Sequence, residues 1–315
     1  MNATKAGAVL QRTITHPIAF HGVGLHSGQA ACLTLRPADP DTGIVFRRVD
    51  LAGQDVVLPA LWHMVEQSPL CTRLVNDAGA SISTIEHVMA ALVGCGVHNV
   101  IIDVDGPEVP ILDGSAAPFV RGILSQRTRS QGAPLRALRV LYPVEVRKGQ
   151  AWARLVPDET LRIEFDIEFD DAAIGVQSKI LNMSNGSFVR ELSNSRTFCR
   201  KADVDQMRAN GLALGGTLEN AVVVDGEKVL SPGGFRHADE AVRHKMLDAL
   251  GDLALAGAPI LGHYHGFRAG HALTNDLLRA LFADPASYEM ILCDDDIAAR
   301  LPGAGVHWDE IPQVA

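Results

Sequence analysis

One order of secondary-structure elements occurs twice along this chain, and the repeat limits the possible folds more than any other feature. A proline-containing strand runs to a glycine turn at 15–24 (THPIAFHGVG) and again at 141–150 (LYPVEVRKGQ). In each half, alternating strands follow, and then a helix and an apolar strand. This order is typical of a duplicated α+β unit, and twin units commonly hold a site in the cleft between them. We therefore predict an α+β fold of two similar domains.

A polar, basic and turn-rich segment separates the two repeats. It reads SQRTRSQGAP at 125–134, a composition typical of an interdomain connection. A length of 315 residues also suits two domains better than one core. We accordingly assign residues 1–126 to a first domain, 127–136 to a linker and 137–315 to a second domain.

Charge and cysteine content restrict the partners and the compartment. A net charge of -9 argues against nucleic acid or an anionic membrane as the main partner and is compatible with a small-molecule substrate. No run reaches the roughly 18 apolar residues of a transmembrane segment. The opening MNATKAGAVLQRTITHP has no signal-peptide pattern. Five scattered cysteines without a CxxC pair indicate reduced thiols. We expect a cytoplasmic protein that acts as a monomer.

The second helix, predicted from Asp239 to about Leu255, carries the strongest chemical signal. His244, Asp248 and Asp252 recur at intervals of four residues, which places them on one helical face. An imidazole and a carboxylate on adjacent turns suit zinc or ferrous iron. The alternative is an ordinary polar helix surface, because such faces are common.

The first helix supplies a complement to these residues. We expect it to begin at Ser83 or Thr84 with a hydroxyl N-cap, so that Glu86 and His87 lie in its opening turn. A catalytic zinc needs three protein ligands, an open position for water and a carboxylate that takes a proton from this water. His87, with the histidine and the first aspartate of the second helix, would complete such a site, and Glu86 would be the general base. The alternative for Glu86 is a favourable interaction with the helix dipole.

Three further patterns have both a functional and a structural interpretation. His271, in FRAGHALTN, is a candidate general acid whose tautomer Asp252 would fix, or else a loop residue. His263-Tyr264-His265 places two rings on one face of a predicted strand, as in many metal sites. We do not assign this pair as ligands, because the helices already provide three. The glycines of FHGVGLHSG resemble half a dinucleotide loop, but a strand follows them in place of a helix, so we predict a hairpin turn.

Several motifs in a fixed order resemble one known family. They are HGVGLHSG, STIEHVMAAL, PEVPILDGSAAPF, SRTF with GLALGG downstream, VRHKMLDALGD and GHAL. From about Gln11 to Leu281 the chain is similar to the UDP-3-O-acyl-N-acetylglucosamine deacetylases, metal-dependent hydrolases that commit bacteria to lipid A and hence lipopolysaccharide synthesis. The resemblance implies that each domain packs a β-sheet layer on a pair of helices, with the active site in the cleft between them. It also implies a Zn²⁺ cofactor, with Fe²⁺ as an alternative in the cell.

The resemblance further implies a role for each matching residue. The metal ligands would be His87, His244 and Asp248. The catalytic residues would be Glu86 as general base, His271 as general acid, Asp252 as its orienting partner and Thr197 as a hydrogen-bond donor to the oxyanion. The substrate-binding residues would be Lys245 and Arg268 at the diphosphate, Phe198 beside the substrate and Phe169 near the nucleotide. An insert at about 197–224 would form a passage for the acyl chain, lined by Val204, Leu212, Ala213, Thr217 and Val223.

Two positions depart from the family pattern, and the sequence also leaves two alternative functions open. Cys199 stands where a glycine is expected, and Ala151 stands where some relatives have lysine, which bears on the nucleotide pocket. One alternative function is a metal amidohydrolase for another acylated substrate. The other is a non-catalytic module that binds a sugar nucleotide or lipid and contains a structural metal. Such a module would need neither a general base nor a general acid.

Overall fold

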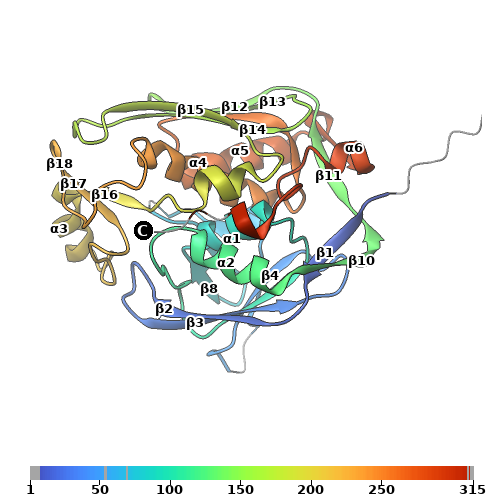
Figure 1. Ribbon diagram of the computed structural model, residues 1–315, viewed down its shortest axis with the longest axis horizontal. Coiled ribbons are helices and arrows are strands. Elements are labelled where there is room, and N and C mark those ends of the chain that lie inside the picture. The colour runs from blue at the N-terminus through green and yellow to red at the C-terminus, as the bar shows by residue number, and fades with distance from the viewer. Residues whose placement is uncertain (1–7, 53–54, 69, 311, 313–315) are drawn as a thin grey trace, which may run out of the picture.

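The computed structural model describes residues 8–52, 55–68, 70–310 and 312, and its elements form four layers. A β-sheet lies on each outer side, and helices from the two halves of the chain meet between the sheets (Figure 1). The α+β class predicted from the sequence is thus confirmed. The first seven residues, which include part of the opening segment, and residues 313–315 lie outside the described residues.

The sheet of the first half has five strands. Their order is β2 (Ile18–Val23), β3 (Ala30–Pro37), β9 (Val100–Val104), β4 (Ile44–Arg48) and β5 (Val57–Pro59). Along this order the neighbours pair antiparallel, antiparallel, parallel and antiparallel. Because β2 and β3 are an antiparallel pair joined by the glycine-rich segment, the predicted hairpin is confirmed.

The sheet of the second half repeats this topology. Five of its strands have the order β12 (Val144–Lys148), β13 (Ala151–Val156), β19 (Ile260–Phe267), β14 (Leu161–Glu168) and β15 (Val176–Asn182). The neighbours again pair antiparallel, antiparallel, parallel and antiparallel. Two strands, β11 (Arg136–Val140) and β20 (Tyr288–Leu292), extend the sheet beyond the repeat. The duplication predicted from the order of elements is therefore confirmed.

Each half places two helices between the sheets. In the first half α1 (Glu86–Gly94) precedes β9 and α2 (Ala117–Gln126) follows it. In the second half α4 (Glu240–Leu253) precedes β19 and α5 (His271–Ala283) follows it. The equivalent helices α1 and α4 pack against each other at the centre of the molecule (Figure 1). Because both are almost entirely buried, their polar side chains require partners.

The predicted start of the first helix is wrong by two or three residues. The helix begins at Glu86, and its N-cap residue, Ile85, provides no side-chain cap. Thr84 has a positive φ of 60°, and its hydroxyl donates a hydrogen bond to Glu108 at 2.8 Å. The hydroxyl of Thr84 therefore bonds to a buried carboxylate in place of the helix end.

Most of the segment assigned as a linker is a β-strand. β10 (Thr128–Pro134) pairs antiparallel with β1 (Leu10–Ile14) near the start of the chain. Gln131 and Ala133 are buried, while their neighbours in the strand are exposed. This alternation is typical of a strand with one solvated face. The turn-type composition at 125–134 therefore does not prevent strand formation.

Smaller elements complete the chain. A three-stranded sheet before α1 consists of β6 (Val65–Glu66), β7 (Arg73–Val75) and β8 (Ser81–Ser83). The region of the predicted insert contains β16 (Phe198–Arg200), α3 (Lys201–Ala209) and β17 (Val222–Asp225), followed by β18 (Lys228–Val229). Short helices occur at Trp62–Met64, Phe188–Leu192, Ala254–Ala256, Pro285–Ser287, Asp295–Ala298 (α6) and Trp308–Glu310.

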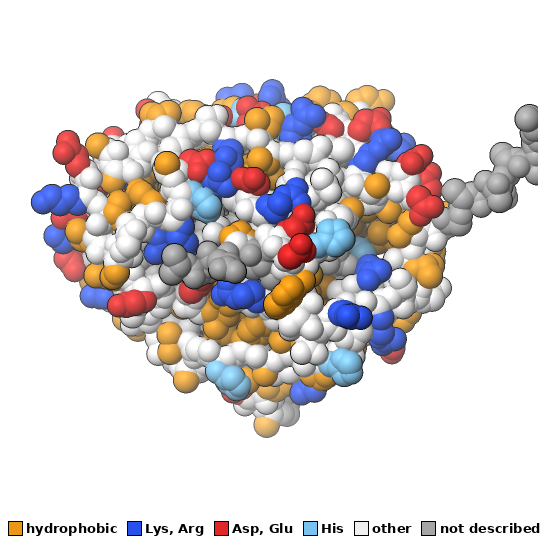
Figure 2. Space-filling model, in the orientation of Figure 1, with side chains coloured by type: hydrophobic (Ala, Val, Ile, Leu, Met, Phe, Trp, Pro, Cys, Tyr) orange, Lys and Arg blue, Asp and Glu red, His pale blue; other side chains and the backbone are white. Residues whose placement is uncertain are grey.

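No helix within the described ranges combines the length and the apolar composition that crossing a bilayer requires. On the face shown in Figure 2, acidic and basic side chains are interspersed, with apolar side chains between them.

Candidate metal centre and active site

Three buried side chains of the two central helices converge on one point. Nε2 of His244 lies 3.2 Å from Oδ1 of Asp248, and Nε2 of His87 lies 3.7 Å from the same oxygen. In a tetrahedral zinc site with bonds of about 2.0–2.1 Å, neighbouring ligand atoms stand about 3.3 Å apart. The observed separations are therefore close to those of ligands that share one ion. These residues form one of the candidate metal-binding groups in the described part of the chain.

The protonation states of these side chains also suit a metal ion. Burial lowers the pKa of His87 to about 3 and lowers that of His244, so both rings are neutral near pH 7. Nδ1 of His244 donates to the carbonyl oxygen of Ser195 at 3.0 Å, which leaves the Nε2 lone pair free for the site.

Asp248 supplies the clearest sign that this group fits an ion. Its Oδ1 atom is buried and has no hydrogen-bond partner among the described residues. Its other oxygen accepts a hydrogen bond from Nζ of Lys245 at 2.7 Å. Burial opposes ionisation, but His244 and Lys245 outweigh burial and hold the pKa of this carboxyl below its ordinary value. A divalent ion would satisfy an oxygen that is otherwise costly to bury.

Glu86 stands beside these three side chains, where a general base is expected. Its carboxylate accepts a hydrogen bond from the backbone N–H of Thr72 at 3.1 Å. Burial raises the pKa of Glu86 to about 7; the charge of His271 opposes this rise, and that of Asp248 adds to it. A carboxyl group with a pKa near neutrality can accept and release a proton at that pH, as a general base must.

His271 and Asp252 form a hydrogen-bonded pair next to Glu86. His271 is the first residue of α5, so the loop interpretation is wrong. Its Nδ1 lies 2.9 Å from Oδ2 of Asp252, and its Nε2 lies 3.8 Å from Oε1 of Glu86. Burial lowers the pKa of His271, but Asp252 and Glu86 outweigh burial and raise it to about 9. The protonated ring thus directs an N–H toward the site, which a general acid requires.

Thr72 is a site residue that the sequence reasoning misses. Its hydroxyl donates to Oδ1 of Asp252 at 2.5 Å, and its backbone N–H donates to Glu86. One residue therefore orients both the candidate base and the partner of the candidate acid. No spacing pattern marks Thr72, because its contact with Asp252 spans 180 positions of the sequence.

A cavity of about 520 Å³ opens next to the metal-binding group. The rings of Phe169 and Phe198 meet edge to face in its wall, and the Phe198 ring centroid lies 6.3 Å from that of His244. Apolar surface therefore adjoins the polar centre. The lining residues include Glu86, His271, Lys245, Thr197, Met207 and Leu212.

The other predicted substrate residues lie outside this lining. Arg268 is exposed just after β19, and its guanidinium group lies 3.3 Å from Oε1 of Gln150. Val204 lies in α3, and Val223 lies in β17, where it is buried. Ala213 and Thr217 lie in the connection from α3 to β17. Of the five predicted acyl-contacting residues, only Leu212 is among the described residues that line the cavity.

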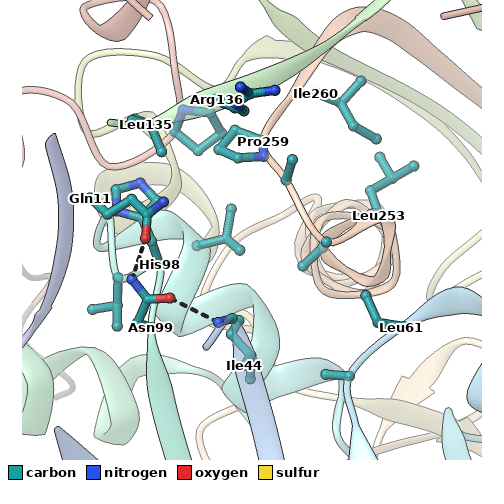
Figure 3. Close-up of a pocket in the computed structure, with 18 of the residues that line it drawn as sticks. Gln11, Ile44, Leu61, His98, Asn99, Leu135, Arg136, Leu253, Pro259 and Ile260 are labelled. Carbon is teal, nitrogen blue, oxygen red and sulfur yellow. Dashed lines mark hydrogen bonds between the residues drawn. The ribbon is translucent and has the colours of Figure 1, made fainter. Parts of the chain in front are cut away.

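A second cavity, of about 380 Å³, lies elsewhere between the two halves. Figure 3 shows Gln11, His98 and Asn99 on one side of it, with Leu253 and Pro259 across from them. The side chain of Asn99 donates to that of Gln11 at 2.7 Å, so these polar groups already satisfy each other. Within the described residues, this cavity shares no lining residue with the cavity at the metal-binding group.

Comparison with known proteins agrees with this arrangement. A family model described as UDP-3-O-acyl N-acetylglycosamine deacetylase matches residues 11–283. A UDP-3-O-acyl-N-acetylglucosamine deacetylase of Shewanella frigidimarina is 45% identical over 305 residues, which cover 95% of this chain and 99% of that protein. A protein of the same name from Shewanella sp. strain W3-18-1 is 46% identical over 285 residues, 90% of this chain and 93% of its own length. The chain therefore belongs to the family of UDP-3-O-acyl-N-acetylglucosamine deacetylases.

Proposed function

We infer that this protein is a metal-dependent deacetylase that removes the N-acetyl group of UDP-3-O-(3-hydroxyacyl)-N-acetylglucosamine. The products are acetate and the free amine, and the reaction is the committed step of lipid A biosynthesis. Family membership over almost the whole chain supports this function. The observation that carries it is the convergence of His87, His244 and Asp248 beside Glu86 and His271. A closed structural metal site would need neither of the last two residues, so a non-catalytic binding module is not favoured.

We propose zinc as the metal, with ferrous iron as the alternative in the cell. Two imidazoles and one carboxylate suit either ion. When bound, the metal supplies a Lewis acid that acidifies water and polarises the acetamide carbonyl. Metal analysis of protein purified without added metal would identify the ion.

The side chains of this protein have separate tasks in the hydrolysis. Glu86 accepts a proton from the attacking water. The Thr197 hydroxyl donates a hydrogen bond to the oxygen on which negative charge develops. His271, held by Asp252, gives its proton to the departing amine, and the C–N bond breaks. The pKa of Glu86, about 7, lies below that of His271, about 9. Between these two values Glu86 is deprotonated and His271 is protonated, which are the starting states that a base and an acid need.

Substrate binding is proposed to use the walls of the cavity. Phe169 and Phe198 offer aromatic surface to the substrate, and Leu212 offers aliphatic surface to the acyl chain. Lys245 keeps its charge, because Asp248 outweighs the effect of burial on its pKa, and so suits a diphosphate. We propose Arg268 as a second diphosphate contact, reached from the exposed end of β19.

The experiment that tests this function is replacement of Glu86. We predict that Glu86→Ala keeps its metal yet loses about 100-fold or more in kcat, because a general base contributes about 10²–10⁴-fold. His244→Ala should lose the metal itself. Glu227→Gln, at an exposed position, is the matched control and should leave both quantities unchanged. Acetate release and metal content are measured on the same samples, and near-normal turnover by Glu86→Ala would overturn the assignment of the base.

Substrate choice separates this function from another metal amidohydrolase. The nucleotide-linked, acylated sugar should be hydrolysed, and free N-acetylglucosamine should not. Comparable rates on both compounds would favour the other hydrolase.

We also propose a cytoplasmic monomer with domains at 1–126 and 137–315. The five cysteines are free, as in a reducing compartment, and the duplicated sheets support the division. Sedimentation analysis tests the monomer.

A further inference from the structure

A buried carboxylate, Glu108, lies at the centre of a hydrogen-bonded group that has no task in the hydrolysis described above. It follows β9 in the loop toward α2, and only 2% of its surface is exposed. One of its oxygens accepts hydrogen bonds from the backbone N–H of His26 at 2.9 Å and from the hydroxyl of Thr84 at 2.8 Å. The other accepts a hydrogen bond from the backbone N–H of Ser27 at 2.7 Å. Because all three donors are uncharged, these hydrogen bonds are what stabilises the buried charge.

This carboxylate joins the turn of the β2–β3 hairpin to the start of α1. His26 and Ser27 belong to the turn, and Thr84 lies two residues before Glu86, the candidate base. A carboxylate that accepts hydrogen bonds from successive backbone N–H groups of a turn holds the turn in one conformation, because these groups must all point at it. Glu108 therefore fixes the turn relative to the candidate base.

The same turn is hydrogen-bonded to the connection between α3 and β17. The backbone N–H of Leu214 donates to the carbonyl oxygen of His26 at 3.1 Å. The backbone N–H of Gly215 donates to the carbonyl oxygen of Leu25 at 3.0 Å. We refer to the turn at 24–28 and this connection together as the strap. The strap joins the first half of the chain to the region of the predicted insert.

The strap contributes apolar surface to the cavity at the metal-binding group. Leu25 of the turn and Leu212 of the connection both line this cavity. Leu212 is also the residue that we propose as a contact of the acyl chain. Neither leucine belongs to a helix or a strand, so the hydrogen bonds of the strap are what fixes their positions. Glu108 thus acts on this wall of the cavity through the turn.

We propose that Glu108 is a positioning residue that sets the acyl-chain specificity of the enzyme. Through the strap it holds the wall formed by Leu25 and Leu212 in place relative to the catalytic side chains. Contacts remote from the reacting bond select a substrate only when the wall that makes them is rigid. This proposal rests on the deacetylase function and deepens it, because it names what selects the acyl part of the substrate.

Kinetics on UDP-3-O-acyl-N-acetylglucosamine substrates with acyl chains of different length test this role. The native chain should discriminate by about 10-fold or more in kcat/KM between chains that differ by two methylene groups. In Glu108→Gln the amide has one oxygen, so the N–H of either His26 or Ser27 loses its acceptor and the turn is no longer held. The discrimination should fall below about threefold through a higher KM for the preferred chain, with kcat and metal content preserved.

Gly215→Ala reaches the strap from its other side and guards against misfolding of Glu108→Gln. The added Cβ atom would lie 2.2 Å from the carbonyl oxygen of Gly24, so the connection must move away from the turn. The same loss of discrimination is expected, although Glu108 is unchanged. Glu227→Gln, at an exposed position, and Gly132→Ala, where an added Cβ atom meets nothing within 4 Å, are the matched controls. Both should keep the native dependence on chain length.

Hydrogen exchange follows the strap without any turnover. The amide hydrogen of Leu214 should exchange about 10-fold or more faster in Glu108→Gln and Gly215→Ala than in the native chain. An unchanged exchange rate would overturn the proposal. So would native discrimination in either variant at full metal content, or an equal loss of kcat/KM on every chain length, which a merely structural role would give.

Failure of the deacetylase function has a different signature. A native chain that releases no acetate from any of these substrates would refute that function, and with it the role in specificity. The exchange rate at Leu214 would still decide whether Glu108 holds the strap.

Discussion

Gly251 permits the close approach of the two helices that carry the proposed metal ligands, and its replacement tests how far the chemistry depends on that approach. A Cβ atom added at this position of α4 would lie 2.1 Å from the carbonyl oxygen of Glu86 and 2.9 Å from its carbonyl carbon. Carbon–oxygen contacts below 3.0 Å essentially do not occur, so α1 and α4 would have to separate by about 1 Å. The obstructing atoms belong to backbone, which has no rotamer to change.

The expected effect of Gly251→Ala on stability has a definite sign. In an unobstructed helix, alanine is better than glycine by about 1 kcal/mol. Overpacking in a core costs about 1–3 kcal/mol, and a backbone clash belongs at the upper end of this range. We therefore expect a net loss of about 2 kcal/mol in the free energy of unfolding, although alanine is the better helix former.

The effect on the site should be larger than the effect on stability. Metal ligands tolerate displacements of about 0.2 Å, so a shift of about 1 Å between His87 on α1 and His244 on α4 should release the ion. A misplacement of about 1 Å in a catalytic group costs about 100-fold in rate.

Three measurements on Gly251→Ala test this reasoning. They are metal content, kcat/KM for acetate release and urea denaturation. Gly132→Ala is the control, because a Cβ atom there meets nothing within 4 Å. Full metal occupancy and unchanged kcat/KM in Gly251→Ala, with stability equal to or above that of the native chain, would refute the argument.

Two further predictions concern the pH profile of the reaction and the buried ion pair between Arg196 and Glu240. The kcat/KM profile should be a bell, because Glu86 (pKa about 7) must be deprotonated and His271 (pKa about 9) protonated; a bound cation lowers both values. Asp252→Asn should move the alkaline limb to lower pH, since Asp252 is the strongest factor that raises the His271 value, and an unmoved limb would contradict the pairing. Arg196→Met leaves the buried carboxylate of Glu240 unpaired, which should cost about 3–5 kcal/mol in urea denaturation. Replacing both partners by Met should recover most of this loss, and equal loss in both variants would argue against the ion pair.

The sequence predicts those parts of the site that have a local pattern. The spacing of His244, Asp248 and Asp252 follows from the helical period, and the structure places all three on the buried side of α4. Likewise, the repeated order of elements predicts the duplicated topology, because strand alternation and helix periodicity are visible within short windows. The equivalence of α1 and α4 in the two repeats explains why the proposed ligands come from two distant segments.

The remaining features depend on contacts between segments far apart in the chain. Thr72 contacts Asp252, and Gly251 lies against Glu86, but neither pair has a spacing that a short window reveals. The hydroxyl of Thr84 suits an N-cap by composition, and only the tertiary partner Glu108 explains why it bonds elsewhere. Strand β10 has a turn-like composition and is a strand because β1 pairs with it.

The most direct test of the metal centre is anomalous diffraction at the zinc edge from crystals of the zinc-loaded protein. We predict a peak within about 2.0–2.2 Å of His87 Nε2, His244 Nε2 and an oxygen of Asp248. A peak that touches fewer than three of these atoms, or an active enzyme with no zinc between α1 and α4, would contradict the account.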